Sequence, residues 1–163
     1  MHKDKKLKWF YDQIIELRNE LFCFAYGILR SVPESEDAVS NAIIKAHTHL
    51  DSLRNKSSFK PWLFRILRNE CYRIAKLQQK TITLYDQTLY PHKVGSEYRV
   101  DVENALSQLP QEQREVITLY YICDYSIKQI VEILEIPSGT VKSRLSRARA
   151  ELKRLLGGEY YEA

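Results

Sequence analysis

Cations, an amide and aromatic rings recur at helical spacing between Trp62 and Leu77. On a helical wheel, one side of this stretch carries Arg65, Arg68, Asn69, Tyr72, Arg73 and Lys76, with Trp62 at its margin. The opposite side carries Leu63, Ile66, Leu67, Ile74 and Leu77, which suit a protein core. Cations can hold phosphates while rings stack on unpaired bases, and each stacked base contributes roughly 1 to 3 kcal/mol. The pattern therefore predicts binding of separated DNA strands, although core packing would also explain the Trp62 ring.

A second polar face lies on the helix predicted from Ser138, a good N-cap residue, to Leu152. One narrow arc of this helix carries Val141, Leu145, Ala148 and Leu152. The opposite side carries Ser143, Ser146 and Arg147, flanked by Lys142 and Arg144. Such side chains can read base edges in the major groove of duplex DNA. With the short apolar helix before it, the pattern is typical of a helix-turn-helix, although a helical hairpin with a solvated basic face would give the same wheel.

The sequence offers little for covalent or metal chemistry. The three cysteines, Cys23, Cys71 and Cys123, are far apart and have apolar neighbours, so we expect buried free thiols. His47 and His49 fall on different sides of a helix. There is no glycine-rich phosphate loop, carboxylate cluster or nucleophile–base pair. We therefore expect no catalytic residue, no metal, no cofactor and no small-molecule substrate.

Length and composition indicate a folded soluble protein. The chain has 163 residues, of which 44% are hydrophobic and 28% charged, and its formal net charge is +4. No apolar run approaches the roughly 18 to 20 residues that cross a bilayer. The basic start, Met1 to Lys8, precedes no apolar block, so it does not resemble a secretory signal. The expected location is the cytoplasm, without membrane insertion.

The small net charge hides a strong segregation. Residues 1–80 hold 15 Lys and Arg against 9 Asp and Glu, a net charge of +6. Residues 81–125 hold 3 against 7, a net charge of −4, and residues 126–163 hold 7 against 5, a net charge of +2. The densest basic stretch, Arg54 to Lys80, contains one acidic residue, Glu70. Two basic segments separated by an acidic one favour phosphate binding, although solvated surface explains many such runs.

The hydrophobic periodicity is helical almost throughout, which predicts an all-α fold. Helices are expected over Trp9–Leu29, Glu34–Leu50 and Trp62–Gln78, then again from about Val100 to Gly157. Between them, Thr81 to Arg99 shows no sustained period and contains Pro91 and Gly95. We therefore predict two small helical domains, over 1–80 and 101–163, joined by a flexible linker over 81–100, the second domain being the helix-turn-helix.

Three blocks of the C-terminal half resemble the minus-thirty-five-binding domain of bacterial sigma factors, above all the small extracytoplasmic-function (ECF) class of the sigma-70 family. They are L-P-Q-E-Q-R-E-V-I (109–117), Y-S-I-K-Q-I-V-E-I-L (125–134) and G-T-V-K-S-R-L-S-R-A-R (139–149). Val131 replaces the usual Ala, and Glu135 replaces the usual Gly of the turn, where a positive φ is mildly costly. The resemblance implies contacts to duplex minus-thirty-five DNA from Ser138, Thr140, Lys142, Ser143, Arg144, Ser146, Arg147 and Arg149.

Three blocks of the N-terminal half resemble the core-polymerase-binding and minus-ten-binding helices of the same class. They are L-F-C-F-A-Y-G-I-L-R (21–30), S-E-D-A-V-S-N-A-I-I-K-A (35–46) and S-F-K-P-W-L-F-R-I-L-R-N (58–69). The resemblance implies that the loop over 55–59 captures an unstacked base. The residues implied to bind melted minus-ten DNA are Lys56, Ser58, Phe59, Trp62, Arg65, Asn69 and Arg73. Ordinary core packing is the alternative role for Phe59.

The resemblance also implies partners. Asp37, Ser40, Asn41 and Ile44 would bind the clamp helices of the largest subunit of core RNA polymerase, and the second domain would bind the flap of the second-largest subunit. An exposed Ile44 beside a carboxylate is typical of a partner surface, although a solvated helix face is the alternative. Ser40 replaces the usual Gln, and His47 stands where the class often has an aromatic residue. Promoter DNA and an anti-sigma factor complete the implied partners.

The predicted function is therefore that of a promoter-specificity subunit. The first alternative is a stand-alone helix-turn-helix regulator, which would bind a palindromic duplex as a dimer. The second basic, aromatic helix in the N-terminal half argues against it. The second alternative is a nucleic-acid hydrolase, which the missing carboxylate cluster and phosphate loop disfavour.

Overall fold

The computed structural model describes residues 2–82 and 97–157, and every regular element within them is helical. The first domain consists of α1 (His2–Leu29), α2 (Val32–Thr48) and α3 (Phe59–Ile82), with the short helical turns η1 (Leu50–Ser52) and η2 (Lys56–Ser58) between α2 and α3. The second domain consists of α4 (Glu97–Gln108), α5 (Gln111–Ile117), the π-helical turn η3 (Thr118–Ile122), α6 (Ile127–Leu134) and α7 (Ser138–Leu155).

The first domain is a three-helix bundle whose core follows from apolar residues three and four apart. α1 buries Phe10, Ile14, Leu17, Leu21, Phe24 and Ile28. The facing side of α2 consists of Ala38, Ala42 and Ala46, whose small side chains let the helices approach closely. α3 contributes Leu63, Phe64, Leu67 and Cys71.

α1 begins at His2, seven residues before the expected start at Trp9. The lysine-rich start is helical because it continues the apolar face: Leu7 packs against the core, and Lys6 Nζ lies 3.0 Å from Asp51 Oδ1.

The second domain holds the predicted helix-turn-helix. α6 and α7 pack against each other, and the inner arc of α7 buries Val141, Leu145 and Ala148 as predicted. α6 ends at Glu135, whose φ of 55° and ψ of 41° place it in the left-handed region, as expected for the position. The expected N-cap role of Ser138 is wrong. The cap is Pro137, whose carbonyl accepts hydrogen bonds from the amides of Thr140 and Val141 at 2.9 and 3.1 Å.

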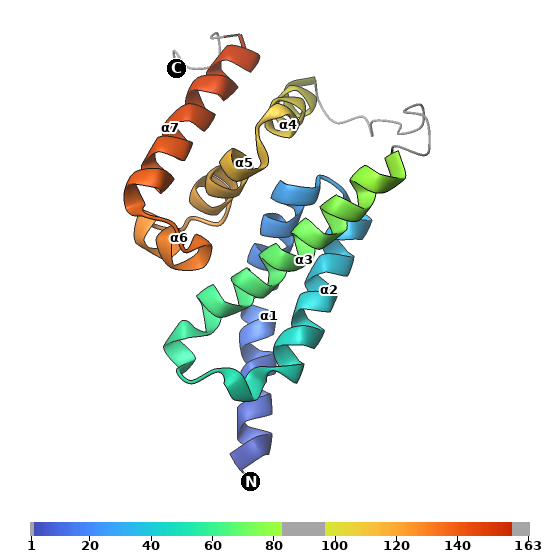
Figure 1. Ribbon diagram of the computed structural model, residues 1–163, viewed down its shortest axis with the longest axis vertical. Coiled ribbons are helices and arrows are strands. Elements are labelled where there is room, and N and C mark those ends of the chain that lie inside the picture. The colour runs from blue at the N-terminus through green and yellow to red at the C-terminus, as the bar shows by residue number, and fades with distance from the viewer. Residues whose placement is uncertain (1, 83–96, 158–163) are drawn as a thin grey trace.

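The two helical domains lie side by side, with α3 against α6 and α1 against α5 and η3 (Figure 1). Their buried residues form one continuous core, in which Phe64 of α3 meets the Tyr125 ring at 5.6 Å between centroids. The all-α, two-domain fold is as predicted, but this close packing was not. Most of the predicted linker, residues 83–96, lies outside the described residues.

Candidate nucleic-acid interface

The start of α3 is shaped by a cluster of aromatic rings. Phe59, the first helical residue, is only 2% exposed and packs edge-on against Trp9 and Phe10, at 5.1 and 5.8 Å between ring centroids. The Trp62 ring lies 6.0 Å away at the half-buried margin. Just before them, the Asn55 side chain accepts a hydrogen bond from the Ser57 amide, which shapes the loop. In this conformation Phe59 therefore belongs to the core, whereas Trp9 and Trp62 are both half-buried.

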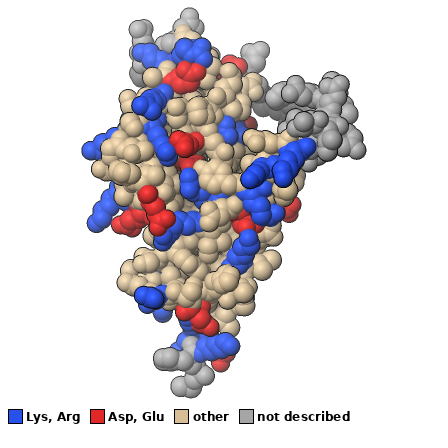
Figure 2. All heavy atoms as spheres, viewed as in Figure 1, with Lys and Arg blue, Asp and Glu red and all other residues tan. Residues whose placement is uncertain are grey.

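The polar side of α3 remains basic despite the carboxylate within it. Glu70 is 2% exposed, forms an ion pair with Lys45, and lies 3.0 Å from Arg73 Nη2. Burial acts to raise the pKa of Glu70, but hydrogen bonds from Lys45 and Arg73 outweigh it and the pKa is lowered. Arg73 and Asn69 remain exposed. Lys and Arg side chains gather over the C-terminal half of α3 (Figure 2).

Three other residues of the same helix turn towards the second domain. Arg65 forms an ion pair with Glu135. Arg68 donates two hydrogen bonds to the Glu115 carboxylate, from Nε to Oε1 at 2.9 Å and from Nη2 to Oε2 at 3.3 Å. The Tyr72 hydroxyl donates to the same carboxylate and accepts a 2.9 Å hydrogen bond from Arg68. Burial acts to lower the pKa of Arg68, but Glu115 more than compensates and the pKa is raised.

The outward side of α7 has the chemistry expected of a groove-reading helix. We call it the α7 outer face; its exposed members are Ser138, Lys142, Ser143, Ser146, Arg147 and Arg149. Thr140 is half-buried and its carbonyl accepts a 3.0 Å hydrogen bond from the Ser143 hydroxyl. Arg144 differs, since its side chain is only 18% exposed and forms a 3.0 Å ion pair with Glu112 of α5. Most of the predicted duplex-binding residues thus lie on the α7 outer face. Arg144 also links α7 to α5 through its ion pair with Glu112.

The four residues predicted to bind polymerase form one stripe along α2, the α2 stripe. Asp37, Ser40 and Ile44 are exposed, Ile44 to 63%, and Asn41 is half-buried. At the end of α2, the His47 ring stacks on Tyr11 of α1 at 6.1 Å between centroids. The α2 stripe thus exposes one apolar side chain, Ile44, and one carboxylate, Asp37.

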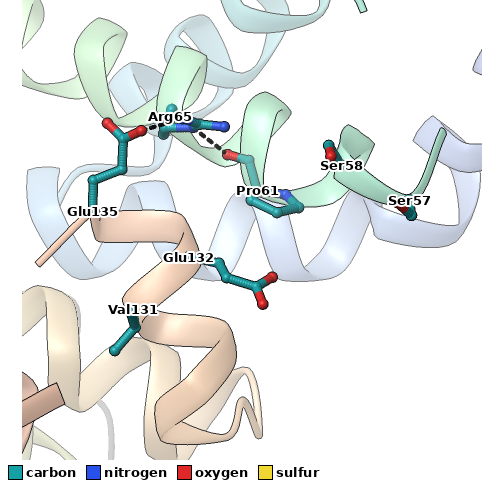
Figure 3. A pocket seen from close by; sticks show the side chains of 7 residues that line it. All are labelled: Ser57, Ser58, Pro61, Arg65, Val131, Glu132 and Glu135. Carbon is teal, nitrogen blue, oxygen red and sulfur yellow. Dashed lines mark hydrogen bonds and ion pairs between the residues drawn. The ribbon is translucent and has the colours of Figure 1, made fainter. Parts of the chain in front are cut away.

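A cleft of about 580 Å³ separates the loop before α3 from the end of α6. It is lined by Ser57, Ser58, Pro61, Arg65, Val131, Glu132 and Glu135. Arg65 crosses it to reach Glu135, and its Nε also donates to the Pro61 carbonyl at 3.3 Å (Figure 3). The carboxylates of Glu132 and Glu135 thus line the same cleft as the loop predicted to capture a base.

Metal ligation, thiol reactivity and membrane insertion can be examined for the described residues. Within 2–82 and 97–157 there is no group of three or more His, Cys, Asp or Glu placed to hold a metal ion. Burial raises the pKa of both the Cys71 and the Cys123 thiols to about 12, so both stay protonated near neutral pH. Among the helices that the structure describes, none has the length and apolar character to span a bilayer.

Glu115 and Glu135 were not identified from the sequence as partners of the basic helix. Glu115 lies 47 residues from Arg68, and Glu135 lies 70 residues from Arg65, so no local pattern links them. The opposite charges of the middle and N-terminal segments were the available signal. The Ser126–Gln129 capping box of α6 was also missed, although S-x-x-Q before an apolar run is its known signature.

Two family profiles match most of the chain. The family described as "Sigma-70 region 2" matches residues 14–81, and that described as "Sigma-70, region 4" matches residues 99–152. The first match covers α2 and all but the last residue of α3, and the second covers α6 and most of α7.

Similar proteins cover both domains. The ECF RNA polymerase sigma factor SigM of Mycobacterium tuberculosis is 32% identical, over 92% of this chain and 79% of the relative. The corresponding SigW of Bacillus subtilis is 31% identical, over 90% and 88%. Among solved structures, sigma factor RpoE in complex with the anti-sigma factor NepR from Bartonella quintana has a TM-score of 0.76 and 32% identity, covering 93% of this chain and 99% of that chain. CnrH, solved with the cytosolic domain of CnrY, has a TM-score of 0.68 at 23% identity and shows the fold alone.

Proposed function

Because this chain belongs to the ECF class of the sigma-70 family, which directs promoter-specific transcription initiation without catalysis of its own, we propose how its residues divide that task. The second domain reads the minus-thirty-five duplex, the first domain holds the melted minus-ten strand, and core RNA polymerase fixes the distance between them. We place the protein in the cytoplasm, where polymerase and promoter lie.

The α7 outer face supports the duplex role. Lys142 and Arg147 are exposed, so their nitrogens can reach guanine edges in a major groove. Ser143 and Ser146 add short hydroxyls that suit either base type. Arg149 hydrogen-bonds the Tyr121 hydroxyl at 3.1 Å, so we assign it to the DNA backbone beside the groove. We assign the remaining three residues to the same duplex site: Ser138 and Thr140 at the start of α7, and Arg144 at the flank of its outer face.

The loop and polar side of α3 support the minus-ten role. Lys56, Ser58 and Asn69 are exposed, and Trp62 on the same helix as Asn69 is half-buried. Arg65 and Arg73 supply cations for the phosphates, while Phe59 supports the Trp62 ring from the core. Stacking at roughly 1 to 3 kcal/mol per base offsets a few kcal/mol of unstacking.

The α2 stripe supports docking on the clamp helices of the largest polymerase subunit, with Ile44 as the apolar anchor and Asp37 as the charge. The second domain would bind the flap of the second-largest subunit. We also propose control by an anti-sigma factor, since the similar RpoE structure was solved in complex with one.

The observation that carries the proposal is the pair of basic helices, one per domain, within a chain of this family. A mobility-shift assay on pooled genomic duplexes, with and without core polymerase, tests it. We expect weak binding by the free chain and tight, sequence-selective binding with core enzyme, because two weak modules gain from effective concentration only when their spacing is fixed. Tight binding as a dimer without polymerase would instead identify a stand-alone regulator.

A further inference from the structure

The first turns of α1 carry a tryptophan that has no role in the proposed function. Trp9 is half-buried and lies one residue before the fully buried Phe10. The match to region 2 begins at residue 14, so Trp9 lies outside it. These turns project beyond the loop that joins α2 to α3 (Figure 1), and Lys6 Nζ anchors them 3.0 Å from Asp51 Oδ1. The ion pair with Asp51 ties the start of α1 to that loop.

One face of the Trp9 ring is covered by a cation from the same loop. Lys56 Nζ lies 4.7 Å from the ring centroid, which is a cation–π contact. Asn55 accepts a 3.0 Å hydrogen bond from the Ser57 amide, so Lys56 stands at the centre of a fixed turn. The Lys56 side chain is nevertheless exposed. This face of Trp9 is therefore open to a molecule that displaces the lysine.

The Trp9 ring is also fixed by the core. Phe59 meets it edge-on, at 5.1 Å between ring centroids, and is itself 2% exposed. Trp62 lies 6.0 Å from the same Phe59 ring. Because Trp9 is ordered before any ligand arrives, little side-chain entropy is lost when something stacks on it. Two half-buried tryptophans thus flank Phe59 beside the loop proposed to capture a base.

The strengths of two competing contacts decide which group covers the Trp9 face. A cation–π contact at an exposed site favours the bound state by about 2- to 5-fold. A base stacked on an aromatic side chain favours it by about 5- to 150-fold. The displaced ammonium of Lys56 can then bind a phosphate of the same strand. An unpaired base therefore replaces Lys56 on the ring, whereas the lysine covers the ring when no base is present.

We propose that Trp9 is a stacking platform for an unpaired base, covered by Lys56 in the free chain and uncovered when that lysine moves to a DNA phosphate. This inference rests on the minus-ten role proposed for the loop over residues 55–59. It adds a residue of α1 to a surface otherwise drawn from α3 and the loop before it. A base inside a duplex is stacked on both sides, so the platform selects melted DNA over paired DNA.

The first test separates the contribution of the bases from that of the phosphates. The probes are a fluorescein-labelled oligothymidine strand and a strand of the same length built from abasic sites, at one fixed salt concentration. Their affinity ratio is measured for the unaltered full chain, for Trp9→Leu and for Trp62→Leu, with circular dichroism to report folding. We expect Trp9→Leu to weaken oligothymidine binding about 2- to 30-fold, the quotient of the two effects above, without weakening binding of the abasic strand.

The affinity ratios distinguish failure of this inference from failure of the proposed function. Equal affinity of the unaltered chain for both strands, including no measurable binding of either, would overturn the minus-ten role of the first domain and the platform with it. A ratio that Trp9→Leu leaves unchanged and Trp62→Leu abolishes would overturn the platform alone, because Trp62 would then be the stacking ring.

Fluorescence gives a readout that leaves Trp9 intact, which matters if Trp9→Leu does not fold. The chain has two tryptophans, so Trp62→Phe makes Trp9 the sole emitter. We expect oligothymidine to quench this emission and the abasic strand not to quench it. Equal emission in the presence of saturating amounts of the two strands would contradict stacking on Trp9.

The proposed move of Lys56 has its own test in the salt dependence of binding. Lys56→Gln removes one phosphate contact, so the slope of log K against log salt for oligothymidine should fall in magnitude by about 0.7. Lys153→Gln, at an exposed lysine of α7, controls for the change in net charge and should keep the slope of the unaltered chain. Equal slopes for the two variants would show that Lys56 stays on the ring, against the proposal.

Discussion

Gly27 offers a steric way to separate the domains without touching any proposed DNA contact. A β-carbon at this position would lie 2.8 Å from Thr118 Cγ2 and 2.9 Å from Thr118 Cβ, and closer still to Oγ1. Ordinary contact between carbons is about 3.5 to 4.0 Å, so Gly27→Ala requires α1 and η3 to move apart by roughly 1 Å. Overpacking of this kind costs about 1 to 3 kcal/mol, which lowers the closed-to-open equilibrium constant about 5- to 150-fold.

The same change favours the first domain itself, because Ala is more stable than Gly in a helix, by at most about 1 kcal/mol for a residue such as Gly27 in the last turn of α1. We therefore expect a larger radius of gyration without loss of thermal stability in the first domain. Gly139→Ala is the matched control, since a β-carbon there meets no atom within 4 Å. Adding Thr118→Ala removes two of the three overlapping atoms and should restore closure in part. Equal radii of gyration for Gly27→Ala and Gly139→Ala would refute the reasoning.

Three further outcomes are expected. Arg147→Ala should weaken minus-thirty-five binding by about 1 to 3 kcal/mol and relax its sequence preference in a competition assay, whereas uniform weakening would make Arg147 a phosphate contact. Asp37→Arg should reduce affinity for core polymerase in a pull-down while leaving Tm unchanged, because Asp37 is exposed. Unchanged affinity would contradict the proposal that the α2 stripe binds polymerase. Because the pKa of Glu70 is lowered in the folded state, its stabilising contribution is present above about pH 4.5 and is lost as the pH falls below it. Urea titrations should show that the free energy of unfolding of Glu70→Gln depends less on pH below about pH 4.5 than that of the unaltered chain. At neutral pH the variant should have lost about 1 to 3 kcal/mol of that free energy.

Local periodicity was sufficient to predict most of the helices and their buried sides. The α7 arc of Val141, Leu145 and Ala148 is confirmed because a 3.6-residue repeat fixes which residues face inward. The left-handed turn at Glu135 is confirmed for a similar reason, since the turn geometry belongs to its position between two packed helices. Leu77, expected on the buried side of α3, is instead 51% exposed near the end of a helix that continues to Ile82.

The interface between the domains could not be predicted from local pattern. Arg68 and Glu115 are 47 residues apart, and nothing within either helix specifies the other as its partner. Gly27 likewise reads as an ordinary helix position until Thr118 lies against it. The segregation of charge, with an acidic middle segment after a basic N-terminal one, was interpreted as a sign of phosphate binding, although it was also the available signal for attraction between the two parts. It could not indicate which side of α3 would be covered.

Transcription from a genomic library by purified core polymerase, with and without this chain, tests the central claim most directly. The account predicts that the chain adds transcripts with defined start sites, and that these weaken when either the α7 outer face is altered at Lys142 or the polar side of α3 is altered at Asn69. Transcripts that are the same with and without the chain, on every template, would contradict it.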